Sequence, residues 1–245
     1  YSNFALMTSL SVNINKIATL RNARGGSVPS VIEHAKNIEH FGAMGITVHP
    51  RPDQRHITYD DVRDLKKNIS VELNIEGNPK EKSFIDLVLE TRPDQVTLVP
   101  DESGQLTSDH GWDTIKEKDF LTDIIQIFSK YKIRTSLFVD PEIKFIEGAK
   151  EIGANRIELY TENYASNFSI DRDKAIAPYV IAAQKASEIS LGINAGHDLN
   201  LENLTFFSAK IPNLSEVSIG HALIADALNF GMENTVNLYL RALKS

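Results

Sequence analysis

The sequence contains no cysteine, so neither a disulfide framework nor a thiolate metal site can form. This absence is typical of a cytoplasmic protein, and we expect that compartment. The chain also lacks an apolar run of the roughly 18 residues that a membrane span requires, so no membrane association is predicted. Basic residues are in the minority, 26 against 33 acidic ones, and the formal net charge of -7 gives no general attraction to nucleic acid. Any anion must therefore be bound at a focused local site.

The first residues lack the basic segment and the apolar stretch of a secretory signal. We interpret residues 1–6 as a leader added ahead of a native start near Met7. No low-complexity segment or linker follows, and 42% hydrophobic with 24% charged residues is an ordinary globular composition. Residues 7–245 are therefore predicted to form one domain.

Short β-rich runs alternate with segments of helical periodicity along the chain, which is typical of parallel βαβ units. Eight such runs favour a closed (β/α)8 barrel, the TIM barrel. An open doubly wound α/β sheet remains the alternative, because the pattern alone does not determine closure. The predicted strands are residues 9–14, 45–49, 71–76, 95–99, 134–140, 156–160, 191–195 and 216–219.

Two polar segments, 101–111 and 161–173, are predicted to be loops at the strand-exit end, where lids often lie. One predicted helix carries clear start and stop signals. Asp140 is expected to cap it, Pro141 to occupy its first position, and Gly153 to end it.

Polar side chains gather where the predicted strands end, and this end of a barrel carries the active site. His49 and Glu76 directly follow apolar runs, so burial and neighbouring charges can adapt them to proton transfer near neutral pH. We interpret both as proton acceptors and His197 as the matching donor. For any single residue, the alternative is a solvated strand end. Three histidines at strand exits, namely His49, His197 and His221, favour catalysis. The strand entrances show no comparable polar set.

Glycines at the last two strand exits predict a phosphate site. Gly196 and Gly220 each precede a histidine and a helical segment, where backbone N–H groups attract phosphate. The loops after strands seven and eight of such barrels are a frequent phosphate site. A turn with a common Gly-His dipeptide is the alternative reading.

Basic residues after the first two strands predict a second anion site. Arg24, Arg51 and His56 are the candidates, because guanidinium groups bind phosphate with two parallel hydrogen bonds. Arg21 and Arg55 are interpreted as solvated surface. The histidines lack a His-x-x-x-His or comparable pair, so no metal is predicted.

Two other functions compete with this interpretation. A lysine-dependent aldolase needs a buried lysine on a strand, and Lys16 is the only lysine beside a strand exit. A non-catalytic phosphate-binding scaffold would keep Arg24 and Gly220 but would have no need for the three proton-transfer residues.

From about residue 10 to the C-terminus, the sequence resembles the pyridoxine 5'-phosphate synthase family. The resemblance implies a (β/α)8 barrel with additional helices. It also implies that eight chains assemble as an octamer built from dimers and that the enzyme works without metal or cofactor. It implies condensation of 1-deoxy-D-xylulose 5-phosphate with 3-amino-2-oxopropyl phosphate to pyridoxine 5'-phosphate, inorganic phosphate and water. The segments that carry it are 12–25 (VNINKIATLRNARG), 45–49 (GITVH), 55–57 (RHI), 73–76 (LNIE), 194–197 (NAGH) and 219–221 (IGH).

The resemblance also implies roles for individual residues. His49 and Glu76 correspond to proton acceptors and His197 to the proton donor, in agreement with the interpretation above. Glu158 lies near the site, and a mobile loop is implied at 101–111. The residues that hold substrate or product are implied to be Asn13, Arg24, Arg51, His56, Thr107, Gly220 and His221.

The sequence departs from the family pattern at two places. Where the family commonly has Asp-His after the first strand, this chain has Asn15 and Lys16, so these substrate contacts are altered and Lys16 takes a charge-pairing role. After His197, Asp198 replaces the glycine that is usual in the family, which changes one backbone contact. We expect all three substituted positions to contact substrate.

Overall fold

The structure is a computed structural model that describes residues 8–101, 104–105 and 107–244. The predicted leader at residues 1–6 lies outside the described residues, as do three positions of the predicted loop 101–111.

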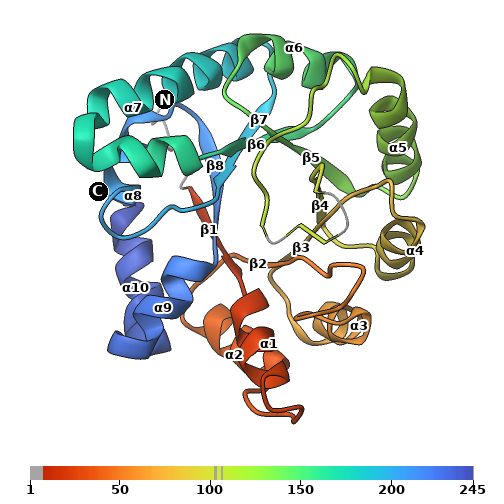
Figure 1. The fold of residues 1–245 in the computed structure, drawn as a ribbon, viewed down its shortest axis with the longest axis vertical. Coiled ribbons are helices and arrows are strands. Elements are labelled where there is room, and N and C mark those ends of the chain that lie inside the picture. Colours follow the sequence, from red (N-terminus) through yellow and green to blue (C-terminus); the bar gives the residue numbers. More distant parts are fainter. Residues whose placement is uncertain (1–7, 102–103, 106, 245) are drawn as a thin grey trace, which may run out of the picture.

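Eight parallel strands form a closed barrel in which each strand pairs with its neighbours in the sequence (Figure 1). Pairing of the first strand with the last closes the ring, which confirms the predicted barrel and rules out the open doubly wound sheet. The predicted strands agree with the observed ones to within two residues at either end. The strands are β1 (Ser9–Asn13), β2 (Gly45–Val48), β3 (Glu72–Gly77), β4 (Gln95–Leu98), β5 (Arg134–Val139), β6 (Arg156–Tyr160), β7 (Gly192–Gly196) and β8 (Leu214–Ile219).

Helices surround the barrel on its outer face (Figure 1). Those in the described chain are α1 (Asn15–Asn22), α2 (Val31–His40), α3 (Tyr59–Asn68), α4 (Lys82–Thr91), α5 (Lys118–Lys130), α6 (Ile143–Glu151), α7 (Glu162–Glu188), α8 (Leu204–Lys210), α9 (His221–Phe230) and α10 (Met232–Ala242). Two helices follow β1 and two follow β8, so the expected additional helices are present. Within the described residues, no helix is both long and apolar enough to cross a membrane.

A belt of polar side chains crosses the barrel interior. Ser11 Oγ lies 2.7 Å from Thr47 Oγ1, Asn74 Nδ2 donates to Thr47 Oγ1 at 3.3 Å, and Thr97 Oγ1 donates to Asn74 Oδ1 at 3.1 Å. Side chains alternate along a strand, so the residues between them, such as Ile46, face the helices and are fully buried. The interior is therefore hydrogen-bonded, whereas barrel interiors are more often filled by branched apolar residues.

The strand entrances also carry polar side chains, contrary to the expectation from the sequence. Glu216 Oε1 accepts hydrogen bonds from Gln95 Nε2 (3.2 Å) and Asn194 Nδ2 (3.4 Å). Arg156 Nη1 lies 3.6 Å from Glu216 Oε2, and Arg134 Nε donates to Gln95 Oε1 at 2.9 Å. Four of these residues, Gln95, Arg134, Arg156 and Glu216, are the first residues of apolar runs. In the sequence, a polar side chain at such a position resembles a solvated strand end. Barrel closure instead turns them inward onto one another.

The prediction of a loop at 161–173 was wrong, because α7 runs through this segment. Tyr164 is fully buried, and its ring packs on that of Phe168 one helical turn later, with centroids 5.5 Å apart. This apolar pair at helical spacing is hidden among polar residues in the sequence. The helix is interrupted only at Asp171, whose φ of -156° and ψ of 90° are not helical.

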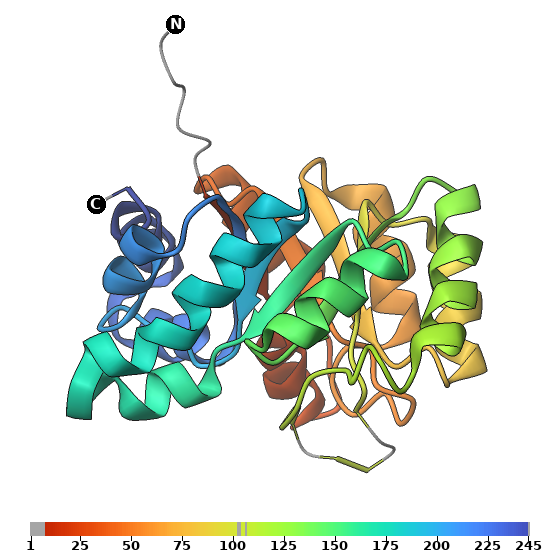
Figure 2. The same ribbon diagram turned by 90° about the horizontal axis from the view of Figure 1, so that it is seen from above.

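The predicted cap of α6 was also wrong, although Gly153 follows the end of that helix with a φ of +87° as expected. The N-cap is Glu142, and its side chain makes no capping hydrogen bond. Asp140 Oδ2 instead accepts a hydrogen bond from the backbone N–H of Gly111 at 3.1 Å. It thereby holds the end of the loop after β4, which projects from the strand-exit end of the barrel (Figure 2).

Candidate active site

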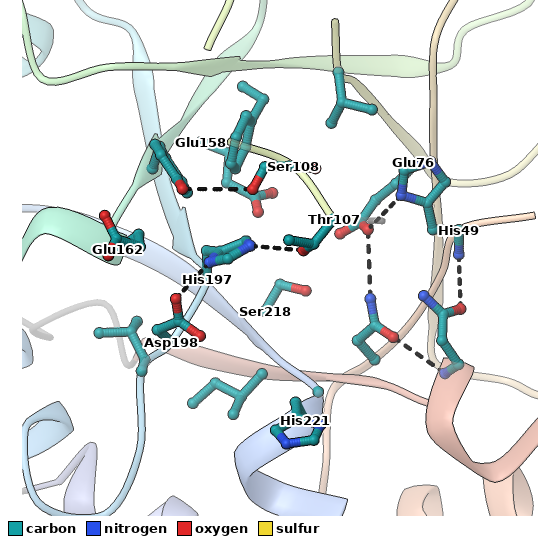
Figure 3. Close-up of a pocket in the computed structure, with 18 of the residues that line it drawn as sticks. His49, Glu76, Thr107, Ser108, Glu158, Glu162, His197, Asp198, Ser218 and His221 are labelled. Carbon is teal, nitrogen blue, oxygen red and sulfur yellow. Dashed lines mark hydrogen bonds and ion pairs between the residues drawn. The ribbon is translucent and has the colours of Figure 1, made fainter. Parts of the chain in front are cut away.

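A cavity of about 500 Å³ opens at the strand exits (Figure 3). Barrel closure brings its residues together from positions more than 200 apart in the chain, because all eight strands exit at the same end. Its lining includes all the site residues predicted from the sequence apart from Arg24 and Gly196. The predicted residues that line it are Asn13, Asn15, Lys16, His49, Arg51, His56, Glu76, Thr107, Glu158, His197, Asp198, Gly220 and His221.

Arg24 lies beyond α1 with an exposed side chain and is not part of the cavity lining. Arg21, interpreted from the sequence as solvated surface, is instead held by two partners outside α1. Its Nη2 donates to Asp61 Oδ2 (2.8 Å) and to the backbone oxygen of His56 (3.2 Å). The interpretation of Arg21 was wrong because Asp61 is 40 positions away in the sequence. Arg21 thus fixes the segment that carries His56.

His49 and Glu76 face each other at the exits of β2 and β3. His49 Nδ1 lies 3.6 Å from Glu76 Oε2, and their side chains are only 8% and 13% exposed. Asn15 Oδ1 accepts a hydrogen bond from the backbone N–H of His49 (2.9 Å), and Asn13 Nδ2 donates to Glu76 Oε2 (3.4 Å). The exit of β1 therefore positions both members of the pair.

Two carboxyl groups of the cavity are protonated more readily than usual. Burial raises the pKa of Glu76 to about 8, and the negative charges of Asp101 and Glu216 add to this rise, whereas Arg51 opposes it. Burial also raises the pKa of Glu158 well above its usual value, with Glu76 and Glu216 adding to the rise. Both groups therefore bind a proton more readily than a free glutamate does, and Glu76, with a pKa near neutral pH, is poised to exchange one.

Two imidazoles of the cavity are neutral at the same pH. Burial lowers the pKa of His49 well below its usual value, and the positive charge of Arg51 adds to this effect. Burial and the charges of Arg51 and Arg55 lower the pKa of His56 to about 4. The backbone N–H of Ile57 donates to His56 Nδ1 (2.9 Å), so Nε2 carries the proton. His49 can thus accept a proton, while His56 offers a neutral N–H donor.

His197 lies across the cavity from His49 and Glu76 (Figure 3). Its Nδ1 is 2.7 Å from Asp198 Oδ2, and its Nε2 is 3.0 Å from Thr107 Oγ1. The ring of Tyr160 meets the imidazole nearly at right angles, with centroids 5.0 Å apart. Three contacts therefore fix the position of this ring.

The loop after β4 is tied to the β2 side of the cavity mouth. Arg51 Nη2 pairs with Asp101 Oδ2 (2.7 Å), and Ser108 Oγ donates to the same oxygen (2.9 Å). Arg55 Nη2 donates to the backbone oxygen of Gln105 (2.5 Å), so its interpretation as solvated surface was wrong. Asp101 was not singled out from the sequence, although it closely follows β4 and the strand-exit rule would have found it.

Other side chains of the site were also missed in the sequence. Ser218 lines the cavity and its hydrogen bond stabilises the charged form of Glu76. The alternation of inward positions along β8 was the signal that could have found it. Gly196, predicted from the sequence to form a phosphate site, is not among the residues that line the cavity. A Cβ there would come within 2.3 Å of Glu158 Oε1, so the glycine leaves room for that carboxyl group. Among the described residues, no group of three or more His, Asp or Glu is arranged to hold a metal ion.

Solved structures of low sequence identity share the architecture. The 3-keto-L-gulonate-6-phosphate decarboxylase of Vibrio cholerae matches 97% of this chain and 98% of its own, with a TM-score of 0.66 and 8% identity. At that identity, the similarity establishes the fold alone.

Sequence relatives are much more similar. The pyridoxine 5'-phosphate synthase of Flavobacterium johnsoniae is 60% identical over 238 residues, which are 97% of this chain and 100% of that protein. The protein of the same name from Christiangramia forsetii matches with the same identity and coverage. Residues 10–245 match the family described as pyridoxal phosphate biosynthesis protein PdxJ. The chain therefore belongs to the PdxJ family.

Proposed function

We propose that this chain condenses 1-deoxy-D-xylulose 5-phosphate with 3-amino-2-oxopropyl phosphate, forming pyridoxine 5'-phosphate, inorganic phosphate and water. The observation that carries the proposal is the convergence of His49, Glu76 and His197 on one cavity. The names of the relatives that match over nearly the whole chain support the same reaction.

The reaction needs imine formation, several proton transfers and the loss of water and phosphate, all sheltered from solvent. The neutral imidazole of His49 accepts a proton, since burial and Arg51 disfavour its charged form. Glu76 exchanges a proton near neutral pH because its pKa lies near 8. His197 donates from the opposite side of the cavity through Nε2. Acid and base groups thus flank the substrates.

Two separate groups of donors suit the two phosphates. The N-terminus of α9 carries Gly220 and His221 at the cavity, where backbone N–H groups and the helix dipole favour an anion. A Cβ at Gly220 would lie 3.0 Å from Asn13 Cβ, so a larger residue there would require Asn13 to shift. Near the exits of β1 and β2, Arg51 and the Nε2–H of His56 form the second group.

Lys16 completes the second group as an exposed cation on the cavity wall. Its side chain is exposed, whereas a Schiff-base lysine is activated by desolvation or by a cationic neighbour. This exposure favours charge pairing with phosphate over an aldolase mechanism.

The assembly and location belong to the same proposal. We infer an octamer of eight chains, built from dimers, in the cytoplasm and active without metal or cofactor. Sedimentation velocity of the purified chain tests the assembly, and a monomer at working concentration would contradict it.

The direct experiment is incubation of the purified chain with both phosphorylated substrates, with pyridoxine 5'-phosphate detected by mass spectrometry and phosphate release by a coupled assay. Product is expected only when both substrates are present, and added chelator is expected to change nothing. Absence of product with both substrates would contradict the proposal.

A further inference from the structure

We propose that Asp198 is a positioning residue for His197, holding the imidazole in the tautomer and charge state that a proton donor requires. This inference rests on the proposed function, in which His197 is the donor. Asp198 itself would not exchange protons with substrate.

The geometry places a carboxylate and a hydroxyl at opposite nitrogens of one ring. Asp198 Oδ2 is 2.7 Å from His197 Nδ1, and Thr107 Oγ1 is 3.0 Å from Nε2 (Figure 3). A carboxylate can only accept a hydrogen bond, so Nδ1 must carry a proton. In the neutral ring, Nε2 is then the free base, and in the imidazolium it is the proton donor that faces the cavity.

The backbone holds the two side chains in this arrangement at a conformational cost. His197 and Asp198 have φ values of +85° and +60°, a region that residues other than glycine seldom adopt. Thr161 Oγ1 donates to the backbone oxygens of Gly196 and His197, and Asn203 Nδ2 donates to that of Asp198 (3.2 Å). The surrounding contacts therefore enforce a turn that aims both side chains at one another.

The chemistry of the pair suits a proton donor. The hydrogen bond from His197 holds the pKa of Asp198 below its usual range, so the carboxylate stays charged. A fixed negative charge at Nδ1 stabilises the imidazolium over the neutral ring. A carboxylate that holds the second nitrogen of a histidine also fixes the ring orientation, as in catalytic triads.

Other charged and titratable groups surround the same side of the cavity. Glu162 begins α7, Asp109 lies in the loop after β4, and Tyr160 and Glu158 belong to β6. His221 begins α9 and is close enough to Asp198 to favour its charged form. Asp198 differs from these groups because its carboxylate contacts a ring nitrogen of His197.

Asp198→Asn is the informative variant, because asparagine tolerates a positive φ and keeps the shape of the side chain while removing the charge. The matched control is Glu202→Gln, which removes one negative charge from an exposed position four residues later. Both variants are studied in the full-length chain.

Kinetics provide the first measurement. Compared with the wild type, Asp198→Asn should lose kcat by about three- to tenfold at pH 8 and by less at pH 6, because more of its His197 has lost the proton as pH rises. KM for both substrates should change little, and Glu202→Gln should match the wild type throughout. An increased KM for the amino substrate with unchanged kcat would overturn the proposal and assign Asp198 to ammonium binding.

Chemical modification provides a measurement that does not depend on turnover. Diethyl pyrocarbonate reacts with unprotonated imidazole, and residues 186–210 form a tryptic peptide with His197 as its single histidine. The pH midpoint of His197 modification should fall by about half to one pH unit in Asp198→Asn and stay unchanged in Glu202→Gln. An unchanged midpoint in Asp198→Asn would overturn the proposal. A wild type that makes no product would contradict the proposed function, while the midpoint would still decide the role of Asp198.

Discussion

Two buried glutamates at opposite ends of the barrel differ in ways that their burial does not predict. Glu76 lies at the strand exits and Glu216 near the entrances, with side chains 13% and 4% exposed. Burial raises both pKa values, to about 8 for Glu76 and about 7 for Glu216. The partners of Glu216 are Gln95, Asn194 and Arg156. The partners of Glu76 are Asn13, His49 and Ser218. Unlike Glu216, Glu76 lines the cavity.

The comparison teaches that a perturbed pKa alone does not identify a catalytic carboxyl. A buried acid is shifted wherever it lies, because burial penalises its charged form. Access to the cavity distinguishes Glu76. We call the strand-exit cavity around His49, Glu76 and His197 the mouth of the barrel, and the polar cluster of Gln95, Arg156, Asn194 and Glu216 its floor.

The largest effect is expected from His49→Ala, which removes the neutral base facing Glu76. We expect kcat to fall by about 10²–10⁴-fold, the range typical of general acid–base groups. Circular dichroism and assembly should be retained, because His49 lies at the cavity and outside the apolar core. The control is His40→Ala on the exposed side of α2, which should keep wild-type turnover. Wild-type kcat in His49→Ala would contradict the role of His49 as a base in the reaction.

The next largest effect is a difference in KM between variants of an arginine inside the cavity, Arg51, and one outside it, Arg24. Arg51→Ala should raise KM for a phosphorylated substrate by about tenfold or more, since a charge-assisted hydrogen bond contributes roughly 1.5–3 kcal/mol. Arg24→Ala should leave KM unchanged, because Arg24 lies outside the cavity lining. Arg51 also pairs with Asp101, so the double variant Arg51→Ala/Asp101→Asn serves as the control. Recovery of wild-type KM in the double variant would show that Arg51 acts only on the loop.

A smaller effect is expected on stability at the floor. The folded-state pKa of Glu216 is raised from 4.5 to about 7, so its contribution to stability is fully present below pH 4.5 and is lost as pH rises through 7. The free energy of unfolding of the wild type should therefore fall by about 1–2 kcal/mol more between pH 5 and 8 than that of Glu216→Gln. Urea titrations at fixed protein concentration measure it. Parallel pH dependences would contradict the assigned burial of this charge.

The smallest effect is a difference in titration midpoints. Infrared spectra of the wild type should show protonated carboxyl bands that disappear on raising the pH. The band that is absent in Glu76→Gln should titrate with a pH midpoint near 8 in the wild type. The band that is absent in Glu216→Gln should titrate with a pH midpoint near 7. Midpoints near 4.5 for both would mean that neither carboxyl is desolvated.

The mouth could be predicted from the sequence far better than the floor. His49, Glu76 and His197 each end or follow an apolar run, and in a barrel such positions meet at one end. Glu216, Gln95 and Arg156 begin apolar runs, yet their partners lie on other strands, at separations that no local pattern encodes.

Differences between the sequence interpretation and the structure share this origin. Arg24 carries the residue type of a phosphate ligand, but the course of the chain after α1 leaves it exposed and outside the cavity lining, and its contact with substrate stays a prediction. Arg21 was assigned to solvent because its partner Asp61 belongs to another helix. The helical start of α7 was hidden because only Tyr164 and Phe168 mark its buried face. In each case a tertiary contact, rather than local composition, decided the outcome.

The most direct test of the contrast is kcat for pyridoxine 5'-phosphate synthesis by Glu76→Gln and Glu216→Gln, measured side by side with the wild type. Both variants remove one buried, titratable proton and preserve side-chain shape. A loss of about 100-fold or more in Glu76→Gln, with Glu216→Gln near the wild-type rate, is the predicted result. Equal losses in the two variants, or full activity in Glu76→Gln, would contradict the assignment of proton transfer to the mouth of the barrel.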